Sequence, residues 1–175
     1  MTIKARQIGA SHSSAAWAVV LAAMTGAPVS VVSIGEREAL EVIDKAQKHA
    51  RILVDLGSRW ARTHVSQGQV QFISGGKIAA LPSSSGARGY SGHVLLDEFA
   101  YHGVNAERVW DAASASTMHG YSLRVVSTPS GVGTTFHGLV MNAARYGYAL
   151  HRVTRGTFNL EMACTEEMLG IATRL

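Results

Sequence analysis

The chain of 175 residues contains one cysteine, no H-E-x-x-H motif and no long apolar run. A lone cysteine, Cys164, excludes an internal disulfide and a zinc site built from several cysteines. The eight histidines are scattered without a tight pair, which argues against a histidine metal centre. The apolar stretch from Trp17 to Met24 is far too short to span a bilayer, and no charged export signal precedes it. We therefore expect a cytoplasmic protein with no membrane partner.

Charged residues are also scarce, at 16%, whereas 47% of the residues are hydrophobic. A chain of this length and composition can supply the core of one folded domain. The formal net charge is +4, which favours a polyanionic partner such as nucleic acid or a nucleotide. An ordinary basic domain explains the same excess equally well, so charge alone leaves the partner open.

The hydrophobic pattern predicts strands that alternate with helices. We expect helices over residues 10–25, 36–56, 106–115 and 135–145. We expect strands over residues 28–34, 69–73, 77–81, 93–98, 121–127 and 148–153. The order predicts an α/β fold with a mostly parallel sheet in three layers, plus one antiparallel hairpin over 69–81.

Polar segments follow three of the predicted strands, and in such sheets ligands bind beyond the carboxyl ends of the strands. The segments are residues 4–11, the acidic pair Asp97-Glu98, and Ser127-Thr128-Pro129. We therefore expect three polar loops to converge at one edge of the sheet.

Residues 4–11 have the length and position of a phosphate loop, between a short strand remnant and a helix N-terminus that favours anions. They read Lys4-Ala5-Arg6-Gln7-Ile8-Gly9-Ala10-Ser11. The usual G-x-x-x-x-G-K-[ST] pattern would need glycine at position 4 and lysine at position 10, so the pattern is not matched. Lys4 or Arg6 could still supply the cation, Gly9 permits close backbone approach, and Ser11 offers a hydroxyl to Mg²⁺.

The apolar run 94–96 ends in Asp97 and Glu98. Asp97 would act on Mg²⁺, directly or through a water, while Glu98 would polarise the water that attacks a γ-phosphate. Neighbouring residues on a strand point to opposite sides, which suits two different roles. The alternative is a strand that simply enters a solvated turn.

Two further segments carry candidate residues. Ser127 and Thr128 could place hydroxyls near the γ-phosphate, although a strand-ending turn at Pro129 explains them as well. Arg88, in a glycine and serine loop, is a candidate charge donor to the phosphoryl transition state, in its own or a neighbouring subunit; a solvated loop arginine is the alternative.

Together these motifs resemble the large subunit of the phage terminase, the DNA-packaging motor, and within it the Mu-like branch. The likeness covers roughly residues 3 to 155. It is carried by four segments of this sequence, which are 5–9, 81–92, 94–100 and 126–131 with the following Phe136.

The resemblance implies a RecA-like P-loop ATPase core in which the strand 123–127 lies between the phosphate-loop strand and the strand that ends in the acids. It also implies that Glu98 is the catalytic carboxylate, that Asp97 is the Mg²⁺ acid, and that residues 127–129 couple ATP hydrolysis to DNA movement. Some members of the family carry the loop lysine at the place of Lys4, and Arg6 matches an arginine thought to act on the phosphates. The implied partners are double-stranded DNA, the portal protein and the terminase small subunit, with the chain in a homo-oligomeric ring on the procapsid.

The same resemblance predicts that residues 1–153 form the ATPase domain, with its first strand clipped, and that 154–175 are a tail leading to a missing nuclease domain. A truncated prophage remnant that binds nucleotide or DNA weakly and packages nothing is the alternative function. A serine hydrolase is a distant third, because Gly89-Tyr90-Ser91-Gly92-His93 has the wrong final residue for a G-x-S-x-G elbow.

Overall fold

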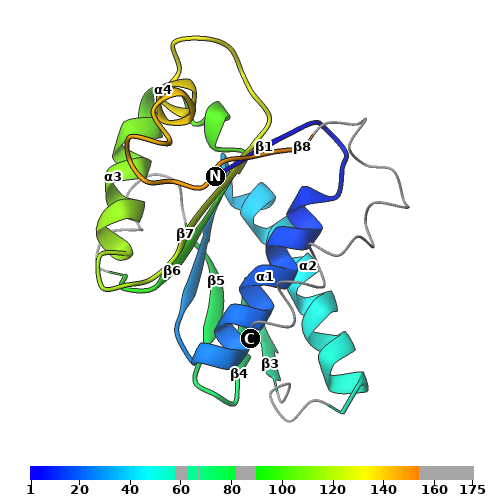
Figure 1. The fold of residues 1–175 in the computed structure, drawn as a ribbon. Helices are drawn as coiled ribbons and strands as arrows, with labels where there is room; N and C mark the ends of the chain where they lie inside the picture. The colour runs from blue at the N-terminus through cyan, green and yellow to red at the C-terminus, as the bar shows by residue number, and fades with distance from the viewer. Residues whose placement is uncertain (58–62, 67, 82–89, 154–175) are drawn as a thin grey trace.

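A twisted sheet of eight strands forms the centre of the computed structural model, which describes residues 1–57, 63–66, 68–81 and 90–153 (Figure 1). The strand order is β3-β4-β5-β2-β6-β7-β1-β8. The strands are β1 (Thr2–Lys4), β2 (Val29–Val32), β3 (Thr63–Ser66), β4 (Gln69–Phe72), β5 (Lys77–Leu81), β6 (His93–Asp97), β7 (Leu123–Ser127) and β8 (His151–Val153). All pairings are parallel except those of β4 with β3 and with β5.

Helices cover both faces of this sheet. They are α1 (Ala10–Thr25), α2 (Glu36–Asp55), α3 (Ala106–Ser116) and α4 (Thr135–Met141), with short 3-10 helices η1 (Phe99–Tyr101) and η2 (Gly103–Asn105) between β6 and α3. In Figure 1, α1 and α2 lie on one side of the sheet, and α3 and α4 lie on the other. The prediction of a three-layer, mostly parallel α/β fold is therefore confirmed, and so are the hairpin and the place of β7 between β1 and β6.

The core is divided into two hydrophobic clusters, one on each face of the sheet. Strand β6 serves both, because its side chains alternate: Leu95 packs in the α1 and α2 cluster, and Val94 and Leu96 pack in the α3 cluster. A strand buried on both faces reads as a continuous apolar run rather than as alternation. The same alternation places Asp97, the next residue after Leu96, on the α1 face.

Besides shorter ends of several strands, three details differ from the prediction. Strand β3 was not expected, because its four residues include only one aliphatic side chain. They therefore show no clear alternation of apolar and polar residues. The helix predicted over 135–145 ends at Met141, and the strand predicted over 148–153 keeps only its last three residues. Between α4 and β8 the chain forms a turn that two backbone hydrogen bonds close. The amide of Gly147 donates to the carbonyl of Ala144 (3.2 Å), and the amide of Tyr148 donates to the carbonyl of Ala143 (2.8 Å). Gly147 has a φ of 71°, which is the glycine-ended closure common after helices.

Among the described residues, no helix is both long enough and apolar enough to cross a membrane.

Candidate functional site

Three loops meet where β1, β6 and β7 end. Lys4, the last residue of β1, is buried and forms an ion pair with Oε1 of Glu98. The backbone amide of Thr128, just after β7, donates to Oε2 of Glu98 (3.3 Å). Ser11, in the first turn of α1, donates its hydroxyl to Oδ2 of Asp97 (3.4 Å). The predicted convergence of the three polar loops is thus confirmed.

The loop from Ala5 to Gly9 leads directly into the N-terminus of α1. Gln7 and Gly9 have left-handed backbones, with φ of 61° and 76°. Gly9 is the N-cap of α1 and has no side chain to cap it, and a Cβ at this position would meet nothing within 4 Å. The first turn of α1 also carries no acidic residue. Free amides and an uncompensated helix dipole at an open surface are what an anion such as phosphate needs.

Asp97 is the residue best suited to a metal ion. It is 5% exposed, and its Oδ1 is buried without a hydrogen-bond partner among the described residues. Burial raises the pKa of Asp97, and the charge of the neighbouring Glu98 raises it further, while the charge of Lys4, the backbone of Glu98 and the hydroxyl of Ser11 lower it. A divalent cation would supply the missing positive charge.

The donor set fits Mg²⁺ rather than a metal held by protein ligands alone. No group of three or more His, Cys, Asp or Glu residues that could hold a metal occurs in the described part of the chain. Mg²⁺ is commonly held by one or two carboxylates together with substrate phosphates and water. Asp97, with the hydroxyl of Ser11 beside it, provides the protein side of such a site.

Glu98 does not continue the strand. It has φ 50° and ψ 40°, a left-handed conformation that costs a residue with a Cβ about 1 kcal/mol or more. The strand predicted over 93–98 therefore ends one residue early, so strand alternation does not set the direction of Glu98: β6 ends at Asp97 and the backbone turns at Glu98. The turn brings the carboxylate of Glu98 between Lys4 and Thr128, and its side chain remains 28% exposed.

Ser127 and Thr128 differ in their burial and in the group through which each makes its hydrogen bonds. Ser127 is fully buried; its hydroxyl accepts from the amide of Ala100 (3.0 Å) and donates to the carbonyl of Thr128 (2.9 Å). Its hydroxyl is therefore engaged with the backbone around Glu98 in this structure, rather than facing the open loop. Thr128 is half-buried and contacts Glu98 through its amide.

Of the two candidate arginines, Arg6 and Arg88, the structure describes only Arg6. Arg6 is exposed, and its Nη2 lies 3.4 Å from the hydroxyl of Tyr101. This hydrogen bond is the main cause that raises the pKa of Arg6. Arg88 lies outside the described residues. Tyr101 was not predicted as a site residue. Its position, three residues after Glu98, was the one feature of the sequence that placed it near the site.

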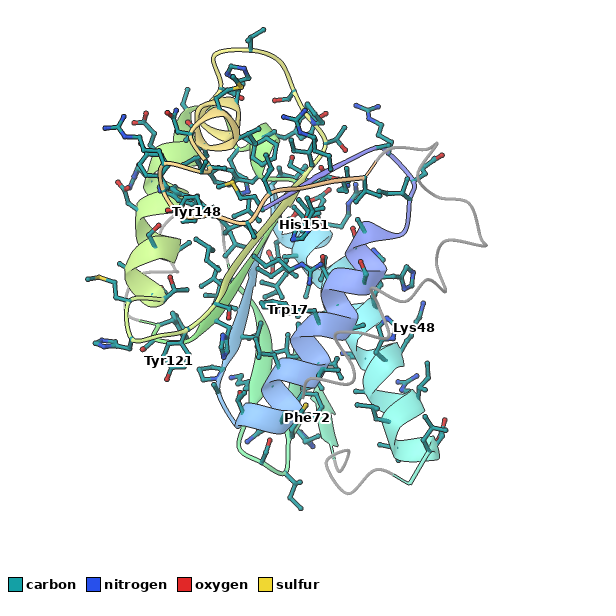
Figure 2. All side chains as sticks on the ribbon, in the orientation of Figure 1. Trp17, Lys48, Phe72, Tyr121, Tyr148 and His151 are labelled. Carbon is teal, nitrogen blue, oxygen red and sulfur yellow. The ribbon has the colours of Figure 1, made fainter. Side chains whose placement is uncertain are left out.

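Two cavities border the loop. One of about 470 Å³ lies on the α4 face and is lined by Lys4, Ala5 and Phe136 among others. The other, of about 560 Å³, is lined by Ile8 and by Trp17 and His151, which Figure 2 labels on α1 and β8. Either is large enough for a small ligand.

A mostly parallel α/β sheet, a glycine-ended loop opening a helix, and an acidic pair at the end of a nearby strand are arranged as in the class of P-loop folds, although residues 4–11 do not match the usual loop pattern. Within that class the family is also clear. Residues 1–152 match the family model described as terminase large subunit, T4likevirus-type, N-terminal. The chain therefore belongs to the terminase large subunit family.

Two curated relatives support this membership. The chain is 34% identical over 145 residues to the Mu-like prophage FluMu protein gp28 of Haemophilus influenzae, covering 71% of this chain and 27% of that protein. It is 32% identical over 169 residues to the probable terminase, large subunit gp28, of Escherichia phage Mu, covering 86% of this chain and 30% of that protein. The chain thus spans less than a third of the length of either relative.

Solved structures support the fold. The Thermus phage P74-26 large terminase ATPase domain is similar with a TM-score of 0.71 at 14% identity, covering 88% of this chain and 74% of that one. A large terminase from another thermophilic bacteriophage is similar with a TM-score of 0.68 at 13% identity, covering 99% of this chain and 43% of that one.

Proposed function

We propose that this chain is the ATPase motor domain of a phage or prophage terminase large subunit, and that it hydrolyses ATP with Mg²⁺ to drive double-stranded DNA into a procapsid. The observation that carries the proposal is the position of Glu98, a partly exposed carboxylate beside a phosphate loop and next to the buried Asp97. Residues 1–153 form the proposed ATPase domain. The proposed partners are DNA, the portal protein, the terminase small subunit and further copies of the chain in a ring.

The phosphates of ATP would bind over residues 5–9 and the open N-terminus of α1, where Gly9 permits close approach. Asp97 and the hydroxyl of Ser11 would hold Mg²⁺, which neutralises charge on the phosphates when bound. Arg6 extends from the same loop and would add a second cation to the phosphates.

Glu98 would orient the attacking water and accept its proton. In the present structure its carboxylate is engaged with Lys4, so Lys4 must exchange this partner for the phosphates when ATP binds. The amide of Thr128, which donates to the other carboxylate oxygen of Glu98, would keep this bond and hold the carboxylate toward the site. Nucleotide binding thereby frees the general base, because Lys4 cannot pair fully with both.

The ion pair also supports the alternative function, a catalytically impaired remnant. If Lys4 remains with Glu98, both the cation for phosphate and the base for water are occupied, and nucleotide would bind weakly without turnover. The two proposals therefore differ in one measurable property, the rate of ATP hydrolysis.

The test compares Glu98→Gln with the wild-type chain in steady-state ATP turnover and in nucleotide binding. We expect the substitution to lower the Mg²⁺-dependent rate by about 100-fold or more, because the general base is lost, while the affinity for ATP is retained. Glu107→Gln, on the exposed start of α3, is the matched control and should leave the rate unchanged. Equal rates in Glu98→Gln and wild type would contradict the motor proposal, and binding without turnover in the wild type would favour the remnant.

A further inference from the structure

The backbone of Ala100 is held from both sides by serine hydroxyls. Ser127 accepts a hydrogen bond from the Ala100 amide (3.0 Å), and Ser130 donates one to the Ala100 carbonyl (2.7 Å). Ala100 is buried, and the two serines come from the end of β7 and the turn that follows it. We call Ser127 and Ser130 the serine clamp.

The clamp lies two residues from the strained turn. Glu98 has a left-handed backbone although it is not glycine, and its carbonyl accepts from the amide of Tyr101 (3.0 Å) to close the turn. Such a conformation persists only where its surroundings hold it. The segment 127–130 provides this support twice, because it grips the backbone at Ala100 and donates the Thr128 amide to the Glu98 carboxylate.

Ser127 and Ser130 are not equivalent halves of the clamp. Ser127 is fully buried, and its hydroxyl makes two bonds, so its removal would leave a buried amide unpaired. The side chain of Ser130 is exposed and reaches back to Ala100 from an open turn. Removing the Ser130 hydroxyl therefore leaves no cavity in the core and releases only the carbonyl side of the turn.

We propose that Ser130 is a positioning residue for Glu98, acting through the carbonyl of Ala100. The clamp keeps the turn in the one conformation that points the Glu98 carboxylate between Lys4 and Thr128. Ser130 does not touch substrate, and its effect reaches the reaction through the backbone of residues 98–100. This role rests on the proposed function of Glu98 as the general base.

The kinetic test uses Ser130→Ala in the full chain. We expect kcat for ATP to fall by about three- to tenfold, the effect of losing one hydrogen bond of ordinary strength, with the Kd for ATP unchanged within about twofold. Ser130→Thr should restore the rate, because threonine keeps the hydroxyl and the exposed site accommodates the methyl group. Ser74→Ala is the matched control: Ser74 is also exposed and donates to a backbone carbonyl, that of Ala22 (3.2 Å), at the far end of α1.

Hydrogen exchange of the backbone amides, measured by NMR, tests the clamp without relying on activity. Exchange at Ala100 and Tyr101 should accelerate in Ser130→Ala and stay unchanged in Ser74→Ala. Unchanged exchange at both amides overturns the proposal, and so does faster exchange with an unchanged kcat in a protein that turns over ATP. If the wild-type chain hydrolyses no ATP, the proposed function falls, while the exchange data still decide whether Ser130 holds the turn.

Discussion

The two ends of α1 are built in opposite ways, although a left-handed glycine bounds each of them. At the C-terminal end, the carbonyl of Ala22 accepts from the amide of Gly26 (3.1 Å) and from the hydroxyl of Ser74 (3.2 Å). A Cβ at Gly76 would clash with that same carbonyl, so the hairpin turn lies directly against the helix. At the N-terminal end, Gly9 faces open space and provides no side-chain cap.

The protein itself completes the C-terminal end of α1, whereas the N-terminal end stays open, and it is there that we propose the phosphates bind. Helix α2 carries Glu36 and Glu38 in its first turn, which compensate its dipole, whereas α1 has no acidic residue there. We therefore expect substitutions at the C-terminal end of α1 to cost stability, and substitutions around its N-terminal end to cost nucleotide binding.

The largest effect on stability should come from Gly76→Ala. The added methyl group clashes with the backbone of α1, which cannot move away without breaking the α1 packing, so we expect the free energy of unfolding to fall by about 2 to 3 kcal/mol. Urea denaturation followed by circular dichroism measures this loss. Gly138→Ala is the control, because a Cβ there meets nothing within 4 Å; an equal loss in both variants would contradict the packing argument.

The next largest effect should be on ATP binding at the N-terminal end of α1. Lys4→Ala should weaken ATP binding by more than about tenfold, because a charge-assisted contact to phosphate contributes roughly 1.5 to 3 kcal/mol. Isothermal titration calorimetry checks this. Lys77→Ala, on an exposed residue that begins β5, should leave the affinity unchanged. If Lys4→Ala binds as tightly as wild type, Lys4 does not contact the phosphates.

Asp97→Asn should stabilise the chain in the absence of nucleotide. Burial raises the pKa of Asp97, so its charged form is unfavourable in the folded state, and the neutral amide should raise Tm near pH 7.5 by about 2 to 4 °C, or roughly 1 kcal/mol. The advantage should shrink as the pH falls through the raised pKa of Asp97, because the wild-type carboxyl then becomes neutral too. Exposed Asp111 offers the control, and a Tm that falls in Asp97→Asn would refute the burial argument.

The smallest effect should be the pH dependence due to His102. Burial lowers the pKa of His102, so the unfolded chain takes up a proton at a higher pH than the folded chain. Stability should therefore decrease as the pH falls below about 6.5, until the lowered pKa is reached. His102→Asn should reduce the slope of stability against pH by up to one proton. His93, also with a lowered pKa, should maintain the remaining slope.

Much of the fold was predictable because the signals were local. The apolar run before Asp97 indicated a strand buried on both faces, and the alanine-rich segment before Gly26 indicated a buried helix. The place of β7 between β1 and β6 came from the resemblance to a family and not from the residues themselves, since strand order depends on long-range pairing.

The details of the site were less predictable, because they arise from contacts distant in sequence. Lys4 and Glu98 are 94 residues apart, and no local pattern shows that they pair. The left-handed backbone of Glu98 is unusual for a residue with a Cβ, and its support comes from Ser127 and Ser130, whose serine, proline and glycine context indicates only a turn. The hydrogen bond between Arg6 and Tyr101 also joins residues distant in sequence, and it depends on how far the Arg6 side chain extends across the loop.

The most direct test of the site is the affinity for ATP measured by calorimetry with and without Mg²⁺, in the wild type and in Asp97→Asn. We predict that Mg²⁺ tightens binding to the wild type by about tenfold or more, and that Asp97→Asn loses this enhancement while it still binds ATP in the absence of Mg²⁺. The same Mg²⁺ enhancement in both proteins, or none in the wild type, would contradict the assignment of Asp97 and the N-terminal end of α1 to a Mg²⁺-nucleotide site.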